Sequence, residues 1–368
     1  MLVKAEPQDI VWSGNFRMIS DIGENVNVSD AQNDVKFNAP VFIGGTGRSG
    51  TSILADILGT HSALYFACHE NKLISEYNGL RDVADVFSHK SDIIRRHFAI
   101  VNFFGRAASM TRFGFRDAAL NQKLSDLCKN RGMGFQQAFE LIQRENPQAS
   151  GSIHAIGQAF GAEYFEKCVK VFLNQLVAHI DQNGIVNTEG LLKPFFLGKD
   201  LQRAEVLAMC REFLFALYAK SGPTRWVDDT PTNALHVDFL HELFPKMKFI
   251  HMVRNPADVV SSYVKQVWFP SDVGLAAKQI SSMLLKTEKL EKALPAESFL
   301  TVRMEDLVGE TEATMAKIAT FLGVENRFNH SFVSSEAANI GRADENPEIA
   351  DAVNSLLGGW KERHGYAS

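Results

Sequence analysis

Residues 40–52, with the sequence PVFIGGTGRSGTS, decide the fold class of this 368-residue chain. Residues 40–45 are an apolar run that ends in two glycines, as a buried parallel strand does. Small residues fill positions 46–50 and predict a tight loop. Positions 51–58 then carry apolar side chains at helical spacing, namely Ile53, Leu54, Ile57 and Leu58. Strand, loop and helix in this order predict an α/β protein with a parallel sheet.

The loop has the chemistry of an anion-binding site. Its glycines let successive N–H groups point inward, and the N-terminus of the following helix adds partial positive charge. The candidate ligand-binding residues are Gly45, Thr46, Gly47, Arg48, Ser49, Gly50, Thr51 and Ser52. The pattern is nearly the nucleotide-binding G-x-x-x-x-G-K-[ST], but Thr51 stands where the lysine that reaches the β- and γ-phosphates would be. Because Arg48 supplies a cation inside the loop, the sequence favours an anion smaller than a triphosphate tail.

A second segment, HMVRNPADVVSSY at residues 251–263, predicts another phosphate contact. Arg254 follows residues 247–253, an apolar run typical of a strand, and Asn255-Pro256 is typical of a helix start. A guanidinium at a strand end can bind phosphate through two N–H groups. Ser262, two turns into the helix, adds a hydroxyl donor. With the phosphate loop, this pair indicates a nucleotide that carries phosphate at two separate places.

The remaining sequence predicts a single domain around the sheet. Residues 1–38 are polar and aperiodic, which indicates an irregular N-terminal arm, and residues 39–368 are expected to form the domain. Residues about 75–225 are mostly helical in pattern and form a large insertion. Its clearest helical stretches include residues 160–180, and a turn is expected at 183–184. Residues 63–66 and 299–302 predict further strands of the sheet.

Composition excludes several classes of protein. Lys and Arg number 38 and Asp and Glu 43, so the net charge is −5 and nucleic-acid binding is disfavoured. No stretch approaches the ~20 apolar residues of a membrane-spanning helix, and the N-terminus lacks a signal-peptide pattern. The sequence therefore predicts a soluble, cytoplasmic protein that does not bind membranes. The four cysteines form no C-x-x-C pair, so neither a metal site nor a disulfide framework is expected.

Several segments resemble sulfotransferases that use 3′-phosphoadenosine 5′-phosphosulfate (PAPS). They are the phosphate loop GTGRSGTS, TRWVDDTPTNALHVDFLHELFPKMKFIHMVRNP, VRNPADVVSSY and VRMEDLVGETEATMAKIATFLGV. The resemblance covers about residues 40–75 and 224–342, and neither the arm nor most of the insertion. It implies a five-stranded parallel sheet related to nucleotide kinases, with PAPS as the cosubstrate.

The same resemblance implies roles for particular residues. Residues 47–52 would hold the 5′-phosphosulfate, and Arg254 and Ser262 would hold the 3′-phosphate. Asp306, in the segment Glu305-Asp306-Leu307, would cap the helix that follows it. No metal is expected, because there is no triphosphate charge to neutralise.

Sulfuryl transfer also needs a group that removes the proton of the acceptor. In the branch that resembles tyrosylprotein and glycan sulfotransferases, this base is a glutamate about twenty residues past the loop. Glu70 matches it, with Lys72 where that branch often has arginine. His69 is the alternative base, since the steroid and phenol enzymes use a histidine, though at a different place. A third interpretation makes Glu70 an exposed surface carboxylate without a catalytic role. If Glu70 is the base, the nearby cations Lys72 and Arg48 would favour its ionised form.

Two further positions bear on the nucleotide. Many relatives have Lys-Thr-Pro where this chain has Asp229-Thr230-Pro231, which places Asp228 and Asp229 near the anion site. Either these carboxylates orient a cationic acceptor, or they cap the helix that starts near Pro231. Arg342, after Gly341, matches a late Gly-Arg in relatives whose loop closes on the nucleotide.

These features predict an enzyme that transfers the sulfuryl group of PAPS to a hydroxyl or amine of a small-molecule acceptor. The reaction would be an in-line displacement with Glu70 as general base. One alternative is a phosphate-loop kinase of nucleotides or small molecules, which the absent lysine disfavours. The other is a non-catalytic nucleotide-binding scaffold of the same fold, which Asp229 at the lysine position leaves open. The insertion carries no motif that identifies the acceptor, and the sequence does not fix the oligomeric state.

Overall fold

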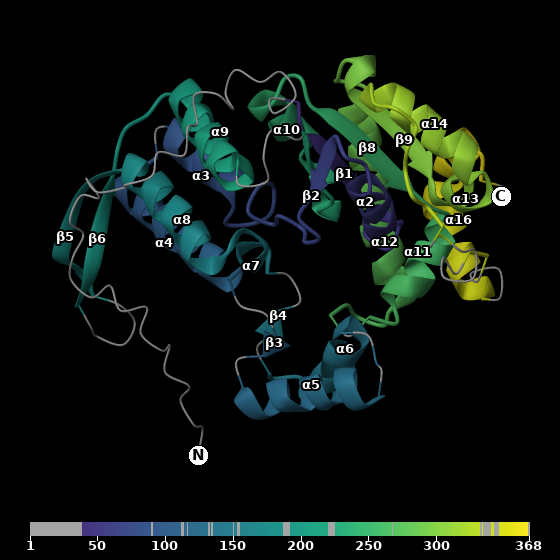
Figure 1. The fold of residues 1–368 in the computed structure, drawn as a ribbon, viewed down its shortest axis with the longest axis horizontal. Helices are drawn as coiled ribbons and strands as arrows, with labels where there is room; N and C mark the ends of the chain where they lie inside the picture. Colours follow the sequence, from purple (N-terminus) through teal and green to yellow (C-terminus); the bar gives the residue numbers. More distant parts are fainter. Residues whose placement is uncertain are drawn as a thin grey trace.

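A five-stranded parallel sheet forms the centre of the computed structural model, with the order β2-β7-β1-β8-β9 (Figure 1). The strands are β1 (Val41–Gly45), β2 (Leu64–Phe66), β7 (Arg225–Asp228), β8 (Lys248–Val253) and β9 (Phe299–Arg303). The predicted parallel sheet is therefore confirmed. The structure describes residues 39–366 except 90, 112–113, 116, 132, 134, 150, 153–154, 187–191, 220–224, 267, 332, 334–339 and 342–345. The predicted N-terminal arm, residues 1–38, lies outside the described residues.

Both faces of the sheet are buried, which explains the unbroken apolar run of β1. Val41 and Ile43 point to one face, where they pack with apolar side chains of three helices. These helices are α2 (Thr51–Gly59), α13 (Met304–Gly309) and α14 (Thr311–Leu322). Phe42 points to the other face, in a cluster that continues through Trp226 and Phe249 into the helical insertion.

Gly44 of β1 lets a neighbouring segment approach the sheet closely. The short 3₁₀ helix η1 (Pro231–Leu235), which follows β7, packs directly on this glycine. A Cβ atom at Gly44 would lie 2.6 Å from the backbone nitrogen of Ala234, so no other residue fits. The first of the two glycines that end the predicted strand is thus explained by packing.

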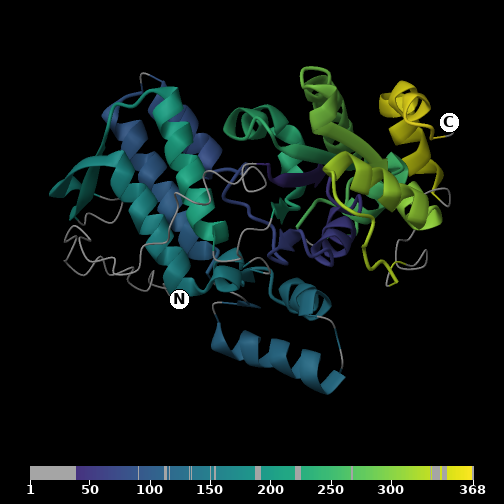
Figure 2. The same cartoon turned by 45° about the horizontal axis from the view of Figure 1, so that its top comes forward.

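Helices dominate the insertion, as predicted, and they form a bundle beside the sheet (Figure 2). They are α3 (Leu80–Ser88), α4 (Ile93–Ser109), α7 (Ile156–Phe160), α8 (Ala162–Leu176) and α9 (Arg203–Ala219). The insertion also contains an unpredicted antiparallel pair, β5 (Val177–Val186) and β6 (Leu192–Gly198). The helix expected over 160–180 therefore ends at Leu176, and the turn expected at 183–184 lies within β5.

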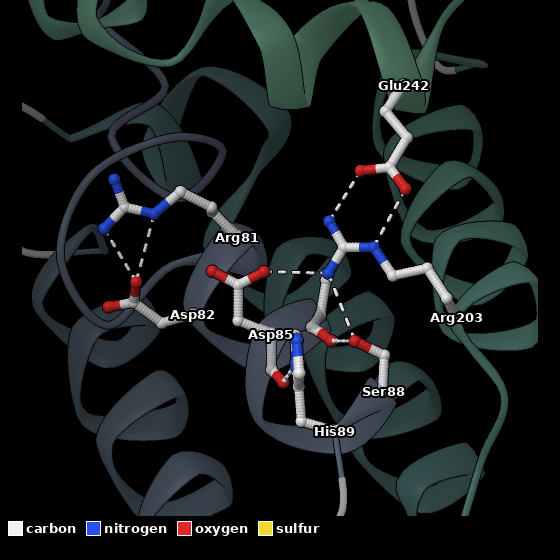
Figure 3. Close-up of polar contacts among 8 residues, drawn as sticks. Arg81, Asp82, Asp85, Ser88, His89, Arg203 and Glu242 are labelled. Carbon is white, nitrogen blue, oxygen red and sulfur yellow. Dashed lines mark hydrogen bonds and ion pairs between the residues drawn. The ribbon is translucent and has the colours of Figure 1, made fainter.

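An ion-pair network connects the insertion to α10 (Val237–Leu243), which leads into β8. Arg203 at the start of α9 donates to both carboxylate oxygens of Glu242 in α10, at 2.9 and 2.6 Å. The same guanidinium donates to Asp85 of α3 at 2.7 Å and to Ser88 at 3.2 Å (Figure 3). This two-bond arginine–carboxylate geometry fixes the relative orientation of the three helices.

A small unit lies apart from the main bundle (Figures 1 and 2). It contains α5 (Ala118–Arg131) and α6 (Phe135–Glu145) and has its own apolar cluster, in which Phe115 and Phe139 stack at 4.3 Å. The chain enters it through β3 (Gly114–Phe115) and leaves through β4 (Gly151–Ser152), which pair antiparallel. We call these residues, 114–152, the α5–α6 unit.

The C-terminal part contains further helices, namely α11 (Pro256–Tyr263), α12 (Val273–Glu291), the short η2 (Ala296–Ser298) and α16 (Pro347–Arg363). Helices α11, α12 and α16 share an apolar cluster with the end of β8. Asp306 was predicted to cap the next helix, and this is wrong: it lies inside α13 and pairs with Arg303 at 3.6 Å. The reason is a break at Glu310, which separates α13 from α14. Within the described ranges, no helix is both long and apolar enough to span a membrane.

Candidate active site

The predicted site residues gather at the carboxyl edge of the sheet. The phosphate loop follows β1, Glu70 follows β2, Asp229 follows β7 and Arg254 follows β8. These four strands are consecutive neighbours in the sheet order. Because parallel strands end at the same edge, residues far apart in sequence face one region, where open α/β sheets bind ligands.

The phosphate loop has the backbone expected of an anion cradle. Gly47 (φ 73°), Arg48 (φ 56°) and Gly50 (φ 94°) are left-handed, and Gly50 is the N-cap of α2. Such turns point successive N–H groups to one side, toward a bound anion. Ser49 is completely buried, and its Oγ has no hydrogen-bond partner among the described residues. Thr51 begins α2 and is also buried, while Ser52 is exposed.

The end of β8 and helix α11 contact the phosphate loop through three side chains. Arg48 donates from Nε to the Oγ of Ser262 at 3.1 Å. Arg254 donates from Nη1 to the backbone oxygen of Arg48 at 3.2 Å. Tyr263 donates its hydroxyl hydrogen to the backbone oxygen of Thr46. The structure therefore brings Arg48, Arg254 and Ser262 together at the rim of the loop.

Arg254 is held from its other side by a buried carboxylate. Its Nη2 lies 3.5 Å from Oδ2 of Asp258, whose side chain is only 1% exposed. The same oxygen accepts a hydrogen bond from the backbone N–H of Gly341 at 2.9 Å. Arg342 itself lies outside the described residues. Its neighbour Gly341 contacts the same carboxylate oxygen of Asp258 as Arg254 does.

Glu70 is paired and largely shielded from solvent. Its Oε2 lies 3.0 Å from Nζ of Lys72, and its side chain is 16% exposed. It is therefore not a solvated surface carboxylate. Its charge also acts on Tyr263, where it adds to the burial that raises the pKa of the phenol to about 12. His69 is half-buried, and burial lowers its pKa.

Two buried carboxyl groups follow β7. Asp228 accepts hydrogen bonds from the N–H of Asn71 at 2.7 Å, the hydroxyl of Thr230 at 3.0 Å and the amide of Asn233 at 2.6 Å. Burial nevertheless raises the pKa of Asp228 to about 6. Burial, together with Asp228 and Glu70, raises the pKa of Asp229 to about 8. Neither group caps η1, since its N-cap is Thr230 without a side-chain bond.

Sequence reasoning did not single out several residues that shape this site. Tyr263 secures the loop, Asp258 orients Arg254, and Asn71 and Asn233 hold Asp228. The available signal for Asp258 was its i+4 spacing from Arg254. Asn71 carried none, because it is distant in sequence from Asp228. Asn233 lies near Asp228 in sequence, but no motif marked it.

A strand, a glycine-rich loop and a helix meet at the carboxyl edge of a parallel sheet, with arginines at the rim of the loop. This arrangement defines an α/β protein with a phosphate-loop-like fold. A model described as "Sulfotransferase family" matches residues 40–329, so the chain belongs to the sulfotransferase family. This confirms the family suspected from the sequence.

Individual relatives are more distant. Two curated proteins named omega-hydroxy-beta-dihydromenaquinone-9 sulfotransferase Stf3, from Mycobacterium bovis and Mycobacterium tuberculosis, are 30% identical over 106 residues. The match covers 26% of this chain, which spans about a quarter (27%) of the length of those relatives. The solved sulfotransferase domain of the Synechococcus PCC 7002 olefin synthase is 16% identical, covering 88% of this chain and 87% of that chain, with a TM-score of 0.41. Sulfotransferase STF9 from Mycobacterium avium is 12% identical, covering 89% and 77%, with a TM-score of 0.45.

Proposed function

We propose that the protein transfers a sulfuryl group from PAPS to a small-molecule acceptor. The observation that carries this proposal is the convergence of Arg48, Arg254 and Ser262 beside a phosphate loop that lacks its lysine. A triphosphate bound to this loop would miss its usual contact with the loop lysine, which normally binds the β- and γ-phosphates. A nucleotide with phosphate on both the 5′ and 3′ positions can use the loop and the arginine rim together.

The residues of the loop suit a 5′-phosphosulfate. The N–H groups at the start of α2 and the inward-facing amides of residues 47–50 provide neutral donors for its oxygens. Ser49 has a buried hydroxyl without a partner among the described residues, which is an unused donor in the loop. Arg254 and Ser262 are assigned to the 3′-phosphate, and Arg342 to the segment that closes on it.

Glu70 is the proposed general base. The acceptor hydroxyl or amine gives its proton to Glu70 as its oxygen or nitrogen forms the new bond to sulfur. The bond from sulfur to the 5′-phosphate oxygen breaks, and adenosine 3′,5′-bisphosphate leaves with that electron pair. Lys72, 3.0 Å from Glu70, favours the ionised carboxylate that this step requires. Donors of the phosphate loop and Arg48 stabilise the charge that develops on the leaving phosphate.

Within residues 39–368, nucleotide binding and acceptor binding are proposed to lie in different parts of the domain. We assign nucleotide binding to the sheet edge and the acceptor to the insertion, residues about 75–225. The α5–α6 unit is part of this insertion, and Arg144 of α6 donates to the backbone oxygen of Lys265, just after α11, at 3.4 Å.

Binding and transfer can be tested separately. Adenosine 3′,5′-bisphosphate should raise the melting temperature strongly and AMP only weakly, because AMP lacks the 3′-phosphate. Equal shifts would refute the 3′-phosphate assignment. Labelled PAPS with a panel of phenols, alcohols and amines should then give a labelled product, and EDTA should not stop it. Hydrolysis or transfer from ATP, restored by Mg²⁺ after chelation, would support a kinase instead.

A further inference from the structure

Three carboxyl groups lie close together beside the phosphate loop: Asp228, Asp229 and Glu70. Two of them are stabilised as anions by their neighbours. Asp228 accepts hydrogen bonds from three donors, and Glu70 forms an ion pair with Lys72. Hydrogen bonds and an opposite charge both favour the ionised form of a carboxyl group.

Asp229 has less of this support, which comes from the Ser52 side chain and from its own backbone N–H. It is 2% exposed, and its Oδ1 is buried without a hydrogen-bond partner among the described residues. Its side-chain partner is Ser52, in the first turn of α2. An ionised carboxylate with so few donors is costly to bury, and two anionic neighbours increase that cost. Of the three groups, Asp229 is therefore the one that keeps a proton.

We propose that Asp229 is a positioning residue that stays protonated while nucleotide binds, holding Ser52 without adding negative charge beside the phosphate loop. This inference rests on the proposed function, since it assumes that the loop binds an anion. A neutral carboxyl group can join α2 to the segment after β7 through Ser52. An ionised one would repel the 5′-phosphate of the nucleotide.

The other groups around Asp229 do not change their charge in the same pH range. Burial raises the pKa of Cys68, on the Glu70 segment, and of Tyr218 on α9, so both stay neutral near pH 8. Asp228 on β7 titrates near pH 6, below that range. The pKa of Asp229 itself is raised to about 8, and a bound phosphate would raise it further.

Nucleotide binding above pH 8 should therefore be linked to uptake of one proton. We would measure the Kd of adenosine 3′,5′-bisphosphate by calorimetry between about pH 7.5 and 9.5, above the range in which Asp228 and the phosphates of the ligand (second pKa about 6) change their charge. For the unmodified protein, Kd should be flat up to about pH 8 and then rise by up to ~10-fold per pH unit. In Asp229→Asn, which is similar in size and cannot ionise, the rise should disappear. Asp56→Asn is the matched control, because Asp56 lies one turn from Ser52 on α2 and is exposed. This control should keep the rise.

A second measurement needs no variant and protects the test against a misfolded Asp229→Asn protein. Titrations near pH 8.5 in buffers of different ionisation enthalpy should show uptake of up to about one proton per bisphosphate bound. A pH-independent Kd with no proton uptake, or an unchanged rise in a folded Asp229→Asn protein, would overturn the inference and leave the proposed function standing. Absence of bisphosphate binding at every pH would instead refute the proposed function.

Discussion

Replacing Arg254 by alanine separates two roles that the structure gives to this side chain. Arg254 faces the proposed 3′-phosphate site and also pairs with the buried Asp258. A charge-assisted hydrogen bond contributes about 1.5–3 kcal/mol, so the Kd for adenosine 3′,5′-bisphosphate should rise roughly 10- to 100-fold. Removing one partner of a buried pair costs ~3–5 kcal/mol of stability. The loss here should lie near the lower end, because Asp258 keeps its hydrogen bond from Gly341.

Calorimetry for the Kd and urea unfolding for stability should be run on the same preparations. Asp258→Asn is the control, because it removes the ion pair and leaves the guanidinium in place. We expect Asp258→Asn to lose stability but to keep the bisphosphate Kd within a few-fold. If Arg254→Ala binds the bisphosphate as tightly as the unmodified protein under conditions where it is folded, Arg254 is structural only and the 3′-phosphate assignment fails.

Two other substitutions test the base and a buried histidine. Glu70→Gln should lower turnover with labelled PAPS by ~10²–10⁴-fold while bisphosphate affinity stays within a few-fold; near-normal turnover with an inactive His69→Ala protein would move the base to His69. His251 on β8 is buried, neither ring nitrogen has a partner among the described residues, and burial lowers its pKa from 6.5 to about 3. Because the unfolded chain binds the proton first, stability should fall as pH drops below 6.5, by ~2 kcal/mol at about pH 5. His251→Leu should lose correspondingly less between about pH 7.5 and 5 in urea unfolding, and an equal loss would contradict this reasoning.

The sheet was predictable because its signals are local. The apolar run before the phosphate loop marks β1, and Asn255 accepts the capping hydrogen bond from the N–H of Ala257 at 3.0 Å, as its position before Pro256 suggests. Each of these features is set by a few adjacent residues. No distant partner is needed to recognise them.

The hairpin of the insertion was not predictable in this way. Most of β5 is exposed, and the strand is defined by pairing with β6 across residues distant from it. Asn183 and Gly184 would end a regular strand, but the pairing shifts register between Asp181 and Ile185 and accommodates them as an irregularity. Tertiary pairing therefore outweighs the local turn signal.

In the candidate site, too, local sequence features were predictable and contacts between distant segments were not. The loop and Arg254 were found from their own sequence context. The proximity of Asp229 to Glu70 and Ser52 depends on the sheet order, which places β7 between β2 and β1. Sequence alone left two roles open for Asp229, and neither included a buried carboxyl group bonded to α2.

The two strands that lead into and out of the α5–α6 unit, β3 and β4, pair with each other, so the unit can be replaced at this point of the chain. Gly114 lies opposite Ser152, and Phe115 opposite Gly151, so the chain leaves and returns at adjacent points. Neighbouring strands are only about 5 Å apart, so a short turn or another helical hairpin can join the same two ends without redirecting α4 or α7. Since the unit has its own apolar core, exchanging it would not open the main one. The α5–α6 unit could thus be exchanged as one piece while the central sheet keeps its structure.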